Sequence, residues 1–479
     1  MNKELGAFIT DFVKDLASNN VAIFAGAGLS KATGYVDWPG LLTDIAEELG
    51  LQIDKETDLI SLAQYHVNEK SRAKLNKRIL EEFVEENELT ENHRILARLP
   101  ISTYWTTNYD NLIENALKEA NKRADVKYEV EQIFNTRPKR DAVVYKMHGD
   151  VSLPARAILT KQDYEKYPMT HEPFLSALTG DLTTKTFLFI GFSFTDPNLD
   201  YVLGRIHAKY HIYGRDHYCF IKRPKLGEKG SETEADLEYS LRKQQLMIGE
   251  LKRYGIQALL IDQYTEITDI LEEIANRFRK RTIFISGSAE EYADWNRPEA
   301  QEFIHKLSHT IVSQGFRIVN GFGWGVGSAV INGALDAVYE RPERHSEDQL
   351  IMKPFPQFKT GEKELPALWE EYRQRMIKLA GIAIFIFGNK LDSSGNVVLA
   401  NGVKREFEIA VQNDLVPIPV PSTGYVAKEI YEQISKDLTT YYAGNEDVIP
   451  MLEELSKYTS KASEGIISKI VQIIKGVNK

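Results

Sequence analysis

The sequence has little cysteine, no long apolar run and no excess of positive charge, and each shortage excludes a class of protein. Cys219 is the only cysteine among 479 residues, which excludes an intrachain disulfide and a zinc site built on two or four cysteines. No segment approaches the roughly 20 apolar residues that a membrane-spanning helix needs. The formal net charge of −10 argues against binding nucleic acid through general attraction to its phosphates.

The first twenty residues also lack the continuous apolar core of a secretory signal peptide. Their apolar side chains recur at helical spacing, with acidic residues between them: Leu5, Phe8, Ile9, Phe12, Val13 and Leu16. This spacing predicts an amphipathic helix, which would pack either on its own domain or on a neighbouring subunit. Together with the scarce cysteine, it favours a cytoplasmic protein without a membrane partner.

The length and the order of apolar segments predict the fold class α/β, with two Rossmann-like domains. A chain of 479 residues is too long for one ordinary core. Short apolar runs alternate with helical patterns, which is typical of parallel sheets covered by helices on both faces. The predicted strands are 21–24, 102–105, 142–146, 186–190 and 256–261, then 282–286, 316–320, 349–352, 382–387 and 416–420.

Two further segments organise the predicted domains. Residues 51–99 have a helical pattern and are expected to form an insertion over the ligand site. We place the domain boundary so that one domain covers 1–281 and the other covers 282–479. A basic run at 277–281 precedes this boundary, and its preferred interpretation is a solvated helix end whose cations lie near the helix C-terminus.

The sharpest local signal is the strand and glycine turn VAIFAGAGLS at residues 21–30. Gly26 and Gly28 lack side chains, so the backbone there can approach a ligand closely. A helix expected from about Leu29 would present free N–H groups to a diphosphate, and Ser30 would add a hydroxyl. The turn lacks the GxGxxG fingerprint and the Gly-Lys-Ser/Thr ending of a Walker loop. A tight structural turn therefore explains it equally well.

Polar residues follow three more predicted strands of the first domain. The loops TTNYD, MHGD and GFSFTDPN contain Asn108, Asp110, His148, Ser193 and Asp196. Because the carboxyl ends of parallel strands meet at one edge of a sheet, these loops are expected to gather around a ligand. Each residue also has a structural explanation, and for Asp196, which precedes a proline, we prefer the role of helix N-cap.

These loops resemble, in order and context, the motifs of the sirtuin family. The sirtuin motifs GAG-x-S, Q-N-I-D, H-G and G-T-S correspond here to GAGLS at 26–30, TNYD at 107–110, HG at 148–149 and GFS at 191–193. The resemblance covers roughly residues 1–280 and implies cleavage of the bond between nicotinamide and ribose in NAD. The residues it implies for binding NAD are Ala25, Gly26, Ala27, Gly28, Ser30, Asp37, Asp110 and Ser193.

The same resemblance makes Asn108 and His148 the catalytic candidates. The amide of Asn108 can orient a ribose hydroxyl or a water, because an amide both donates and accepts hydrogen bonds. Asp110 can accept from the carboxamide of nicotinamide. His148 can act as general base, since imidazole ordinarily titrates near neutral pH.

The sequence also departs from the sirtuin pattern. Sirtuins that remove acyl groups from proteins usually carry four zinc cysteines, and their P-D-F-R segment corresponds here to VDWP at 36–39, which retains Asp37 but lacks the arginine. Water is therefore the expected acceptor, with nicotinamide and ADP-ribose as products. NAD is then a substrate, and we expect neither a cofactor nor a metal. An NAD-dependent protein deacylase and a non-catalytic nucleotide-binding module remain the alternatives.

The second domain contains two glycine turns, at 286–288 and at 321–328. The second turn opens a helix and would offer N–H groups to phosphate, although a purely structural glycine loop is the alternative. It lacks the Walker lysine and the PGGxGT pattern of related phosphoribohydrolases, so binding is favoured over catalysis. This domain resembles the SLOG family of nucleotide-sensing modules. The signal-binding residues that we predict are Ser286, Gly287, Ser288, Gly323, Gly325, Gly327, Ser328, Arg373, Lys390, Asn401, Gly402 and Glu406.

The charges of three of these residues support a role in binding a nucleotide. Arginine and lysine suit phosphates, so Arg373 and Lys390 are candidates for that role, and Glu406 suits ribose hydroxyls. A solvated surface charge is the alternative for each of them.

A sirtuin-like domain followed by a SLOG domain resembles the effectors of the bacterial Thoeris antiphage system over nearly the whole chain. The resemblance implies an NAD hydrolase that stays inactive until a cyclic ADP-ribose isomer, made by a partner TIR protein, binds the SLOG domain. It also implies a homo-tetramer and the arrest of infected cells through NAD depletion.

Overall fold

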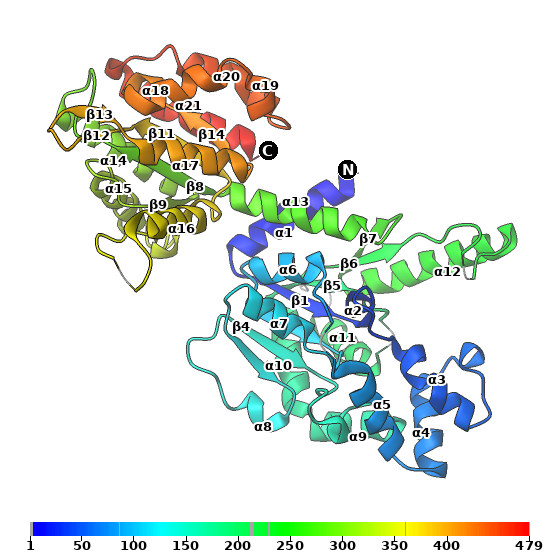
Figure 1. Ribbon diagram of the computed structural model, residues 1–479. Helices are drawn as coiled ribbons and strands as arrows, with labels where there is room; N and C mark the ends of the chain where they lie inside the picture. Colours follow the sequence, from blue (N-terminus) through cyan, green and yellow to red (C-terminus); the bar gives the residue numbers. More distant parts are fainter. Residues whose placement is uncertain are drawn as a thin grey trace. The chain divides into compact units, whose positions relative to one another are not determined.

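The chain forms two compact units, Met1–Ala275 and Asn276–Lys479. The computed structural model describes residues 3–85, 87–194, 196–210, 215–228, 230–359 and 361–478. Both units contain a parallel sheet with helices on its faces, so the predicted α/β class is confirmed (Figure 1). Among the helices of the described segments, none combines the length and apolarity needed to cross a bilayer.

The first unit is built on seven parallel strands in the order β3-β4-β2-β1-β5-β6-β7. The chain moves outward from β1 through β2 and then returns to β5 on the other side of β1, so the strand order reverses at β1. Ligands of open α/β sheets bind at the carboxyl ends of strands beside such a reversal. The strands are β1 (Val21–Ala25), β2 (Thr103–Thr106), β3 (Ala124–Lys127), β4 (Ala142–Lys146), β5 (Thr186–Ile190), β6 (His217–Lys222) and β7 (Ile256–Ile261).

Two of these strands, β3 and β6, were not predicted. The short strand β3 contains Asp125 and Lys127, whose charges hide it from a search for apolar runs. These two side chains are buried and form an ion pair with each other at 2.9 Å. The two charges therefore neutralise each other within the sheet, so their presence does not indicate an exposed loop.

The helix α1 (Lys3–Ala17) confirms the amphipathic pattern of the N-terminus. All six of the predicted apolar residues are buried. The ring of Phe8 packs against Tyr218 of β6 with 4.6 Å between centroids. The question that the sequence left open is thereby answered, because α1 packs on its own unit.

A helix begins in the turn after β1, as predicted. This helix, α2 (Ala27–Lys31), has only five residues, and α3 (Trp38–Glu48) follows it. Gly34 lies between them with φ of +100°, a conformation that breaks a helix and that glycine adopts at little cost. Asp37 then caps α3 by accepting a hydrogen bond from the Gly40 N–H at 3.1 Å.

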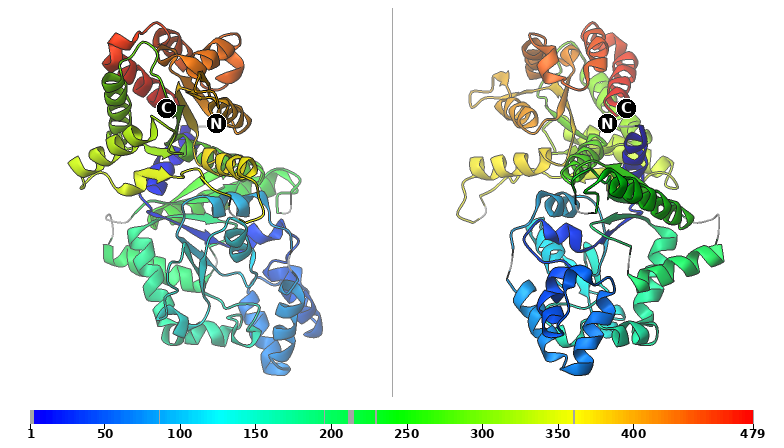
Figure 2. Two further views of the ribbon diagram at one scale, coloured as in Figure 1. Left: turned by 60° about the vertical axis from the view of Figure 1, so that its left-hand side comes forward. Right: turned by 90° about the vertical axis from the view of Figure 1, so that its right-hand side faces the viewer.

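The remaining helices of the first unit lie around the sheet. The helical pattern at 51–99 is confirmed by η1, α4, α5 and α6, and α3, α4 and α5 lie together as one lobe (Figures 1 and 2). The helices are η1 (Ile53–Lys55), α4 (Leu59–Glu69), α5 (Ala73–Phe83), α6 (Glu91–Arg98), α7 (Leu112–Glu119), α8 (Val130–Ile133), η2 (Pro154–Arg156), α9 (Lys161–Thr170), α10 (Glu172–Thr184), α11 (Pro197–Tyr210), α12 (Glu234–Arg253) and α13 (Glu266–Lys280).

The second unit has five parallel strands in the order β10-β9-β8-β11-β14, so its strand order reverses between β8 and β11. All five strands were predicted. They are β8 (Thr282–Ser288), β9 (Arg317–Asn320), β10 (Leu350–Met352), β11 (Ile382–Phe387) and β14 (Val416–Pro419). A two-stranded antiparallel hairpin, β12 (Asn389–Leu391) with β13 (Val397–Leu399), was not predicted.

Helices of the second unit pack on this sheet around a buried apolar core. The predicted helix at 298–315 is α14, and Gly315 adopts a positive φ of +83° directly after its C-cap. The helices are α14 (Arg297–Ser313), α15 (Gly327–Glu340), η4 (Glu347–Gln349), α16 (Leu365–Ile377), α17 (Asn401–Gln412), η5 (Pro421–Thr423), α18 (Tyr425–Ile434), α19 (Leu438–Tyr441), η6 (Glu446–Val448), α20 (Ile449–Leu455), η7 (Ser460–Ala462) and α21 (Ser463–Val477).

Candidate functional site

A cleft lies where β1 and β2 end in the first unit. Five residues predicted to bind or cleave NAD line it: Ala27, Ser30, Asp37, Asn108 and Asp110. The other lining residues are mostly apolar or aromatic and were not predicted: Val36, Trp38, Leu41, Phe83, Thr107 and Tyr109. A mostly apolar wall with a few converging polar groups is the usual make-up of a small-molecule site.

Asn108 is held in a fixed orientation at this cleft. Its Nδ2 donates to the carbonyl of Gly26 at 3.1 Å and to the Ser30 hydroxyl at 2.9 Å. The Ser30 hydroxyl in turn donates to the Asp110 carboxylate at 2.8 Å. Because both amide hydrogens are engaged with the β1 turn, the amide oxygen is the group of Asn108 that remains to meet a ligand.

The glycines of the turn have a packing role that is visible in the structure. A Cβ on Gly26 would lie 2.4 Å from the carbonyl oxygen of Gly191, and one on Gly191 would lie 2.2 Å from the backbone nitrogen of Leu29. Gly191 also has φ of +65°, which favours glycine. These glycines therefore allow the loops after β1 and β5 to pack in direct contact. Packing alone is enough to require glycine at Gly26 and Gly191, with or without a bound ligand.

Asp37 lines the cleft but is already engaged twice. It caps α3, and its other carboxylate oxygen pairs with Lys31 at 2.7 Å. Burial alone would raise the pKa of Asp37, but the hydrogen bonds from Lys31 and the Gly40 N–H hold it below the usual value. Asp37 is therefore a charged group whose position is fixed before any ligand arrives.

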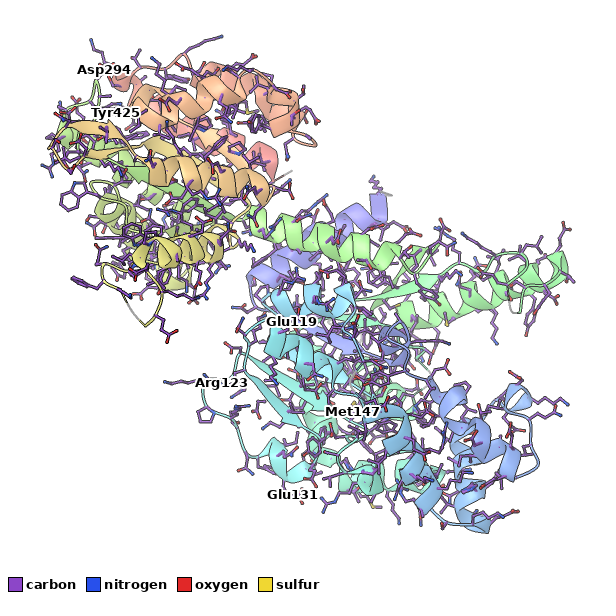
Figure 3. The ribbon with its side chains drawn as sticks, in the orientation of Figure 1. Glu119, Arg123, Glu131, Met147, Asp294 and Tyr425 are labelled. Atoms are coloured by element: carbon purple, nitrogen blue, oxygen red, sulfur yellow. The ribbon has the colours of Figure 1, made fainter. Side chains whose placement is uncertain are left out.

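His148 lies outside the lining of this cleft and is fully buried. Its Nε2 lies 3.0 Å from Oδ2 of Asp196, and the same carboxylate oxygen accepts a hydrogen bond from the Tyr164 hydroxyl at 3.2 Å. Met147, labelled in Figure 3, precedes His148, is buried, and accepts a hydrogen bond from Tyr167 through its carbonyl at 3.0 Å. The histidine thus sits on a well-anchored segment.

Asp196 has a second role that sequence reasoning missed. As predicted, its Oδ1 caps α11 by accepting from the N–H groups of Asn198 and Leu199, both at 3.0 Å. The contact with His148 was not predicted, because the two residues are far apart in sequence. Burial alone would raise the pKa of Asp196, but the neighbouring His148 and the hydrogen bonds lower it, so the carboxylate is ionised.

The loops that carry Asn108 and His148 are tied together by Lys146, the last residue of β4. Its fully buried Nζ donates to the carbonyls of Tyr109 and Asp110 at 3.1 and 2.7 Å, and it pairs with Glu114 and Asp150. Burial alone would lower the pKa of Lys146, but the charges of Glu114 and Asp150 raise it. A charged lysine therefore fixes the spacing of two loops that both carry predicted catalytic residues.

Three other predicted residues were Ala25, Gly28 and Ser193. Gly28 lies against Gly191, where a Cβ would be 2.8 Å from the Cα of that residue. Ala25 is the buried last residue of β1, and its carbonyl accepts a hydrogen bond from the Thr106 hydroxyl at 2.9 Å. Ser193 is exposed in the loop after β5. Over the residues that the structure describes, no group of three or more histidine, cysteine or acidic side chains is arranged to hold a metal ion.

Part of the predicted signal site in the second unit is a connected cluster. The Ser286 hydroxyl donates to Glu406 at 2.6 Å, and the Arg373 guanidinium lies 3.5 Å from the other oxygen of Glu406. Arg373 also lies over the ring of Phe355 at 5.1 Å, and a Cβ on Gly402 would lie 3.0 Å from its Nη2. Burial raises the pKa of Glu406, although Ser286 and Arg373 oppose that rise.

The glycine loop of the second unit packs directly on the end of β8. A Cβ on Gly323 would lie 2.0 Å from the carbonyl oxygen of Gly287, and one on Gly325 would lie 1.9 Å from that of Ala289. Gly327 and Ser328 form the first turn of α15. The Ser288 hydroxyl donates to the Asn389 carbonyl at 2.9 Å, which joins β8 to the hairpin.

Two predicted signal residues lie apart from the Glu406 cluster. Lys390 is exposed on β12, and Asn401 is exposed at the first position of α17. Phe355 and the fully buried Asn389, whose Oδ1 accepts from the N–H groups of Glu290 and Glu291, were not predicted. Their contacts are long-range, and no local pattern marks them.

Two family descriptions match the chain. The family described as "SIR2-like domain" matches residues 102–259, and the "Sir2- and TIR-associating SLOG family" matches residues 266–477. Three relatives are similar over nearly the full length, and each is named "NAD(+) hydrolase ThsA". The relative from Bacillus cereus is 49% identical and the match covers 99% of this chain and 98% of that protein. Those from Cytobacillus dafuensis and Acinetobacter baumannii are both 46% identical, covering 97% and 98% of this chain and 95% and 98% of theirs.

Proposed function

The chain belongs to the family of NAD(+) hydrolases named ThsA, and on that premise we propose that its first unit hydrolyses NAD to nicotinamide and ADP-ribose under the control of its second unit. NAD binds in the cleft between the loops that follow β1 and β2. Asn108 and His148 are the catalytic residues, and water is the acceptor. The observation that carries this proposal is the Asn108 amide, fixed by Gly26 and Ser30 beside a cleft that Asp37 and Asp110 also line.

The chemistry divides between these residues. Positive charge moves from the pyridinium to the ribose as nicotinamide leaves. The oxygen of Asn108, whose amide hydrogens are held elsewhere, accepts a hydrogen bond from a ribose hydroxyl or from the attacking water. Asp110 accepts from the nicotinamide carboxamide, and His148 takes up the proton that the water or the hydroxyl releases.

The second unit binds a cyclic ADP-ribose isomer at the Glu406 cluster and the glycine loop. Arg373 and Lys390 meet its phosphates, Glu406 meets a ribose hydroxyl, and the N–H groups at the start of α15 add to the phosphate site. A signal that binds the active arrangement more tightly than the resting one shifts the population toward activity. The words "TIR-associating" in the matching family description support a partner TIR protein as the source of the signal.

The biological setting completes the proposal. The enzyme acts in the cytoplasm as a homo-tetramer, and its activation during phage infection depletes NAD and stops the infected cell, as the resemblance to Thoeris effectors implies. Such an activity has to be regulated, because NAD hydrolysis in the absence of the signal would be toxic to an uninfected cell.

Nicotinamide release from NAD by the purified full chain tests the proposal. We expect release without any acylated peptide and expect cyclic ADP-ribose isomers to increase it. Release only when an acylated peptide is supplied would identify a deacylase instead. Binding of NAD without turnover under all of these conditions would identify a non-catalytic module.

A further inference from the structure

The imidazole of His148 contacts a carboxylate on only one of its two nitrogens. Nε2 lies 3.0 Å from Oδ2 of Asp196. Nδ1 is buried and, within the described part of the chain, has no hydrogen-bond partner. Buried polar atoms in native proteins are almost always paired, so an orphaned ring nitrogen points to a partner that arrives with a ligand.

Both oxygens of Asp196 are committed as acceptors. Oδ1 accepts from the backbone N–H groups of Asn198 and Leu199 at the start of α11. Oδ2 accepts from Tyr164 at 3.2 Å and faces Nε2 of His148. An ionised carboxylate cannot donate, and Asp196 is held ionised by its surroundings. The hydrogen between Asp196 and His148 must therefore belong to Nε2.

A hydrogen on Nε2 settles the tautomer of the neutral ring. Nδ1 then carries the lone pair and is the nitrogen that can accept a proton. The orphaned position of Nδ1 agrees with this assignment, because the nitrogen that serves as base needs an unoccupied lone pair in the resting enzyme. The carboxylate also stabilises the imidazolium that forms when the base takes up a proton.

We propose that Asp196, supported by Tyr164, is a positioning residue that holds His148 with Nε2 protonated and Nδ1 as the general base. The reaction that it serves is the NAD hydrolysis proposed above, and to that extent the inference rests on that function. During this step Nδ1 accepts the proton of a water or ribose hydroxyl, and the positive charge of the ring is shared with the Asp196 carboxylate. No other co-reactant is needed.

The titratable groups around the ring come from three places. Asp196 faces it from the start of α11, Tyr164 from α9 with its hydroxyl 3.5 Å from Nε2, and His171 from the junction of α9 and α10. Burial raises the pKa of Tyr164 well above its usual value, so this phenol stays a donor. Burial and the neighbouring His148 lower the pKa of His171. Among these three groups, Asp196 carries the negative charge that faces the base near neutral pH.

Substituting Asp196 separates its two roles. In Asp196→Asn, the new amide can cap α11 with its oxygen only by turning its NH₂ toward Nε2, which forces the hydrogen onto Nδ1 and removes the base. Serine is as good an N-cap as aspartate but is too short to reach the ring. We therefore expect Asp196→Asn to lower kcat for nicotinamide release by about 10²- to 10⁴-fold, with KM changed much less. Asp196→Ser should keep the cap of α11 and still lose activity.

Two further variants complete the activity series. Tyr164→Phe removes the hydrogen bond that the phenol donates to the ionised Asp196 carboxylate, and we expect a loss of about tenfold. Asp200→Asn is the matched control, because Asp200 lies on the same helix and its Oδ1 accepts from Tyr254 at 3.3 Å, away from the base. That variant should retain the kcat and the pH profile of the original enzyme.

A nuclear magnetic resonance measurement tests the inference without any turnover. The full chain is labelled with ¹⁵N-histidine, and His148→Gln identifies the resonances of the ring. We expect the Nε2–H tautomer in the original chain and the Nδ1–H tautomer in Asp196→Asn. If the chain hydrolyses no NAD but shows these two tautomers, the proposed function is contradicted, whereas the positioning of His148 by Asp196 is still supported.

Three results would overturn the positioning role. One is an Nδ1–H tautomer in the original chain. Another is an Asp196→Asn variant with full kcat and an unchanged pH profile. The third is faster nicotinamide release by Asp196→Asn, which would mean that the carboxylate restrains His148 instead of positioning it.

Discussion

The side-chain amide of Asn108 donates to the Ser30 hydroxyl at 2.9 Å, and that hydroxyl donates to the Asp110 carboxylate at 2.8 Å. This short chain of hydrogen bonds joins the loop after β1 to the loop after β2. It fixes the orientation of Asn108, so this side chain needs little reorganisation to meet the NAD that we propose binds here.

Replacing Ser30 by alanine should disturb both neighbours. Asn108 loses an acceptor and Asp110 loses a donor inside the fold, so we expect the free energy of unfolding to fall by about 1–3 kcal/mol. Nicotinamide release should fall about tenfold, because the loss of one hydrogen bond of this strength frees the amide to turn. The control is Thr43→Ala, whose hydroxyl donates to the Pro39 carbonyl on an exposed helix face. Equal behaviour of the two variants in urea unfolding and in turnover would contradict the role given to Ser30.

Replacing Lys146 by methionine should destabilise the first unit strongly. Removal of this buried cation leaves the buried Asp150 and the part-buried Glu114 without their counter-charge, which typically costs about 3–5 kcal/mol. The melting temperature of the full chain should fall by about 6–12 °C. Lys77→Met is the control, because Lys77 is 72% exposed and pairs with Glu81 at 3.3 Å on the same helix. That exposed pair contributes about 0.5 kcal/mol or less, so a similar loss in both variants would contradict this account of Lys146.

Acid should destabilise the first unit through two buried histidines. Burial lowers the pKa of His93 and of His217 to about 4. In the unfolded chain they titrate near 6.5, so between about pH 4 and 6.5 the unfolded state binds more protons than the folded state. The free energy of unfolding therefore rises with pH across that window, by up to about 1.4 kcal/mol per pH unit for each histidine.

The variant His93→Phe measures how much of this pH dependence of the free energy of unfolding comes from His93. The variant should flatten the rise in the free energy of unfolding between pH 5 and 6.5, measured by urea unfolding and circular dichroism. Above pH 7.5 His93 is neutral in both the folded and the unfolded chain. The difference in the free energy of unfolding between His93→Phe and the original chain should therefore be constant there. An unchanged slope between pH 5 and 6.5 would show that His93 is protonated in the folded state.

Two arginines of α16 offer a matched test of the second unit. Arg373 lies 3.5 Å from the buried Glu406, whereas Arg375 is 75% exposed and pairs with Glu371 on the same helix. Arg373→Ala removes the cation that we propose binds a phosphate of the signal, and it leaves Glu406 without its partner. We expect at least a tenfold weaker response to cyclic ADP-ribose isomers, by titration calorimetry and by nicotinamide release. Arg375→Ala should bind as the original chain does, and the same loss in both variants would remove Arg373 from the site.

Much of the fold could be predicted because its signals are local. Strands such as β1 and β11 are continuous apolar runs, and α1 has an uninterrupted helical period that ends with all six predicted residues buried. The strand β3 escaped prediction because Asp125 and Lys127 neutralise each other only after folding. The start of α2 was predicted, but its early end was not, because the break at Gly34 depends on a backbone angle.

The candidate site also has some features that the sequence predicts and others that depend on the folded structure. Strand ends brought Ser30, Asn108 and Asp110 to one cleft, as the order of loops predicted. The pairing of His148 with Asp196 joins the loop after β4 to the start of α11, and no spacing in the sequence encodes it. Lys146 was predicted only as the end of a strand, because its partners come from three separate segments.

The most direct test of the account is nicotinamide release from NAD by the purified full chain, with and without cyclic ADP-ribose isomers, beside Asn108→Ala and His148→Ala. We predict release that rises when the activating isomer is added. Both variants should lose at least about 99% of it while they remain folded, since positioned amide and general-base groups typically contribute 10²-fold or more. Full activity in both variants, or nicotinamide release that no isomer changes, would contradict the account.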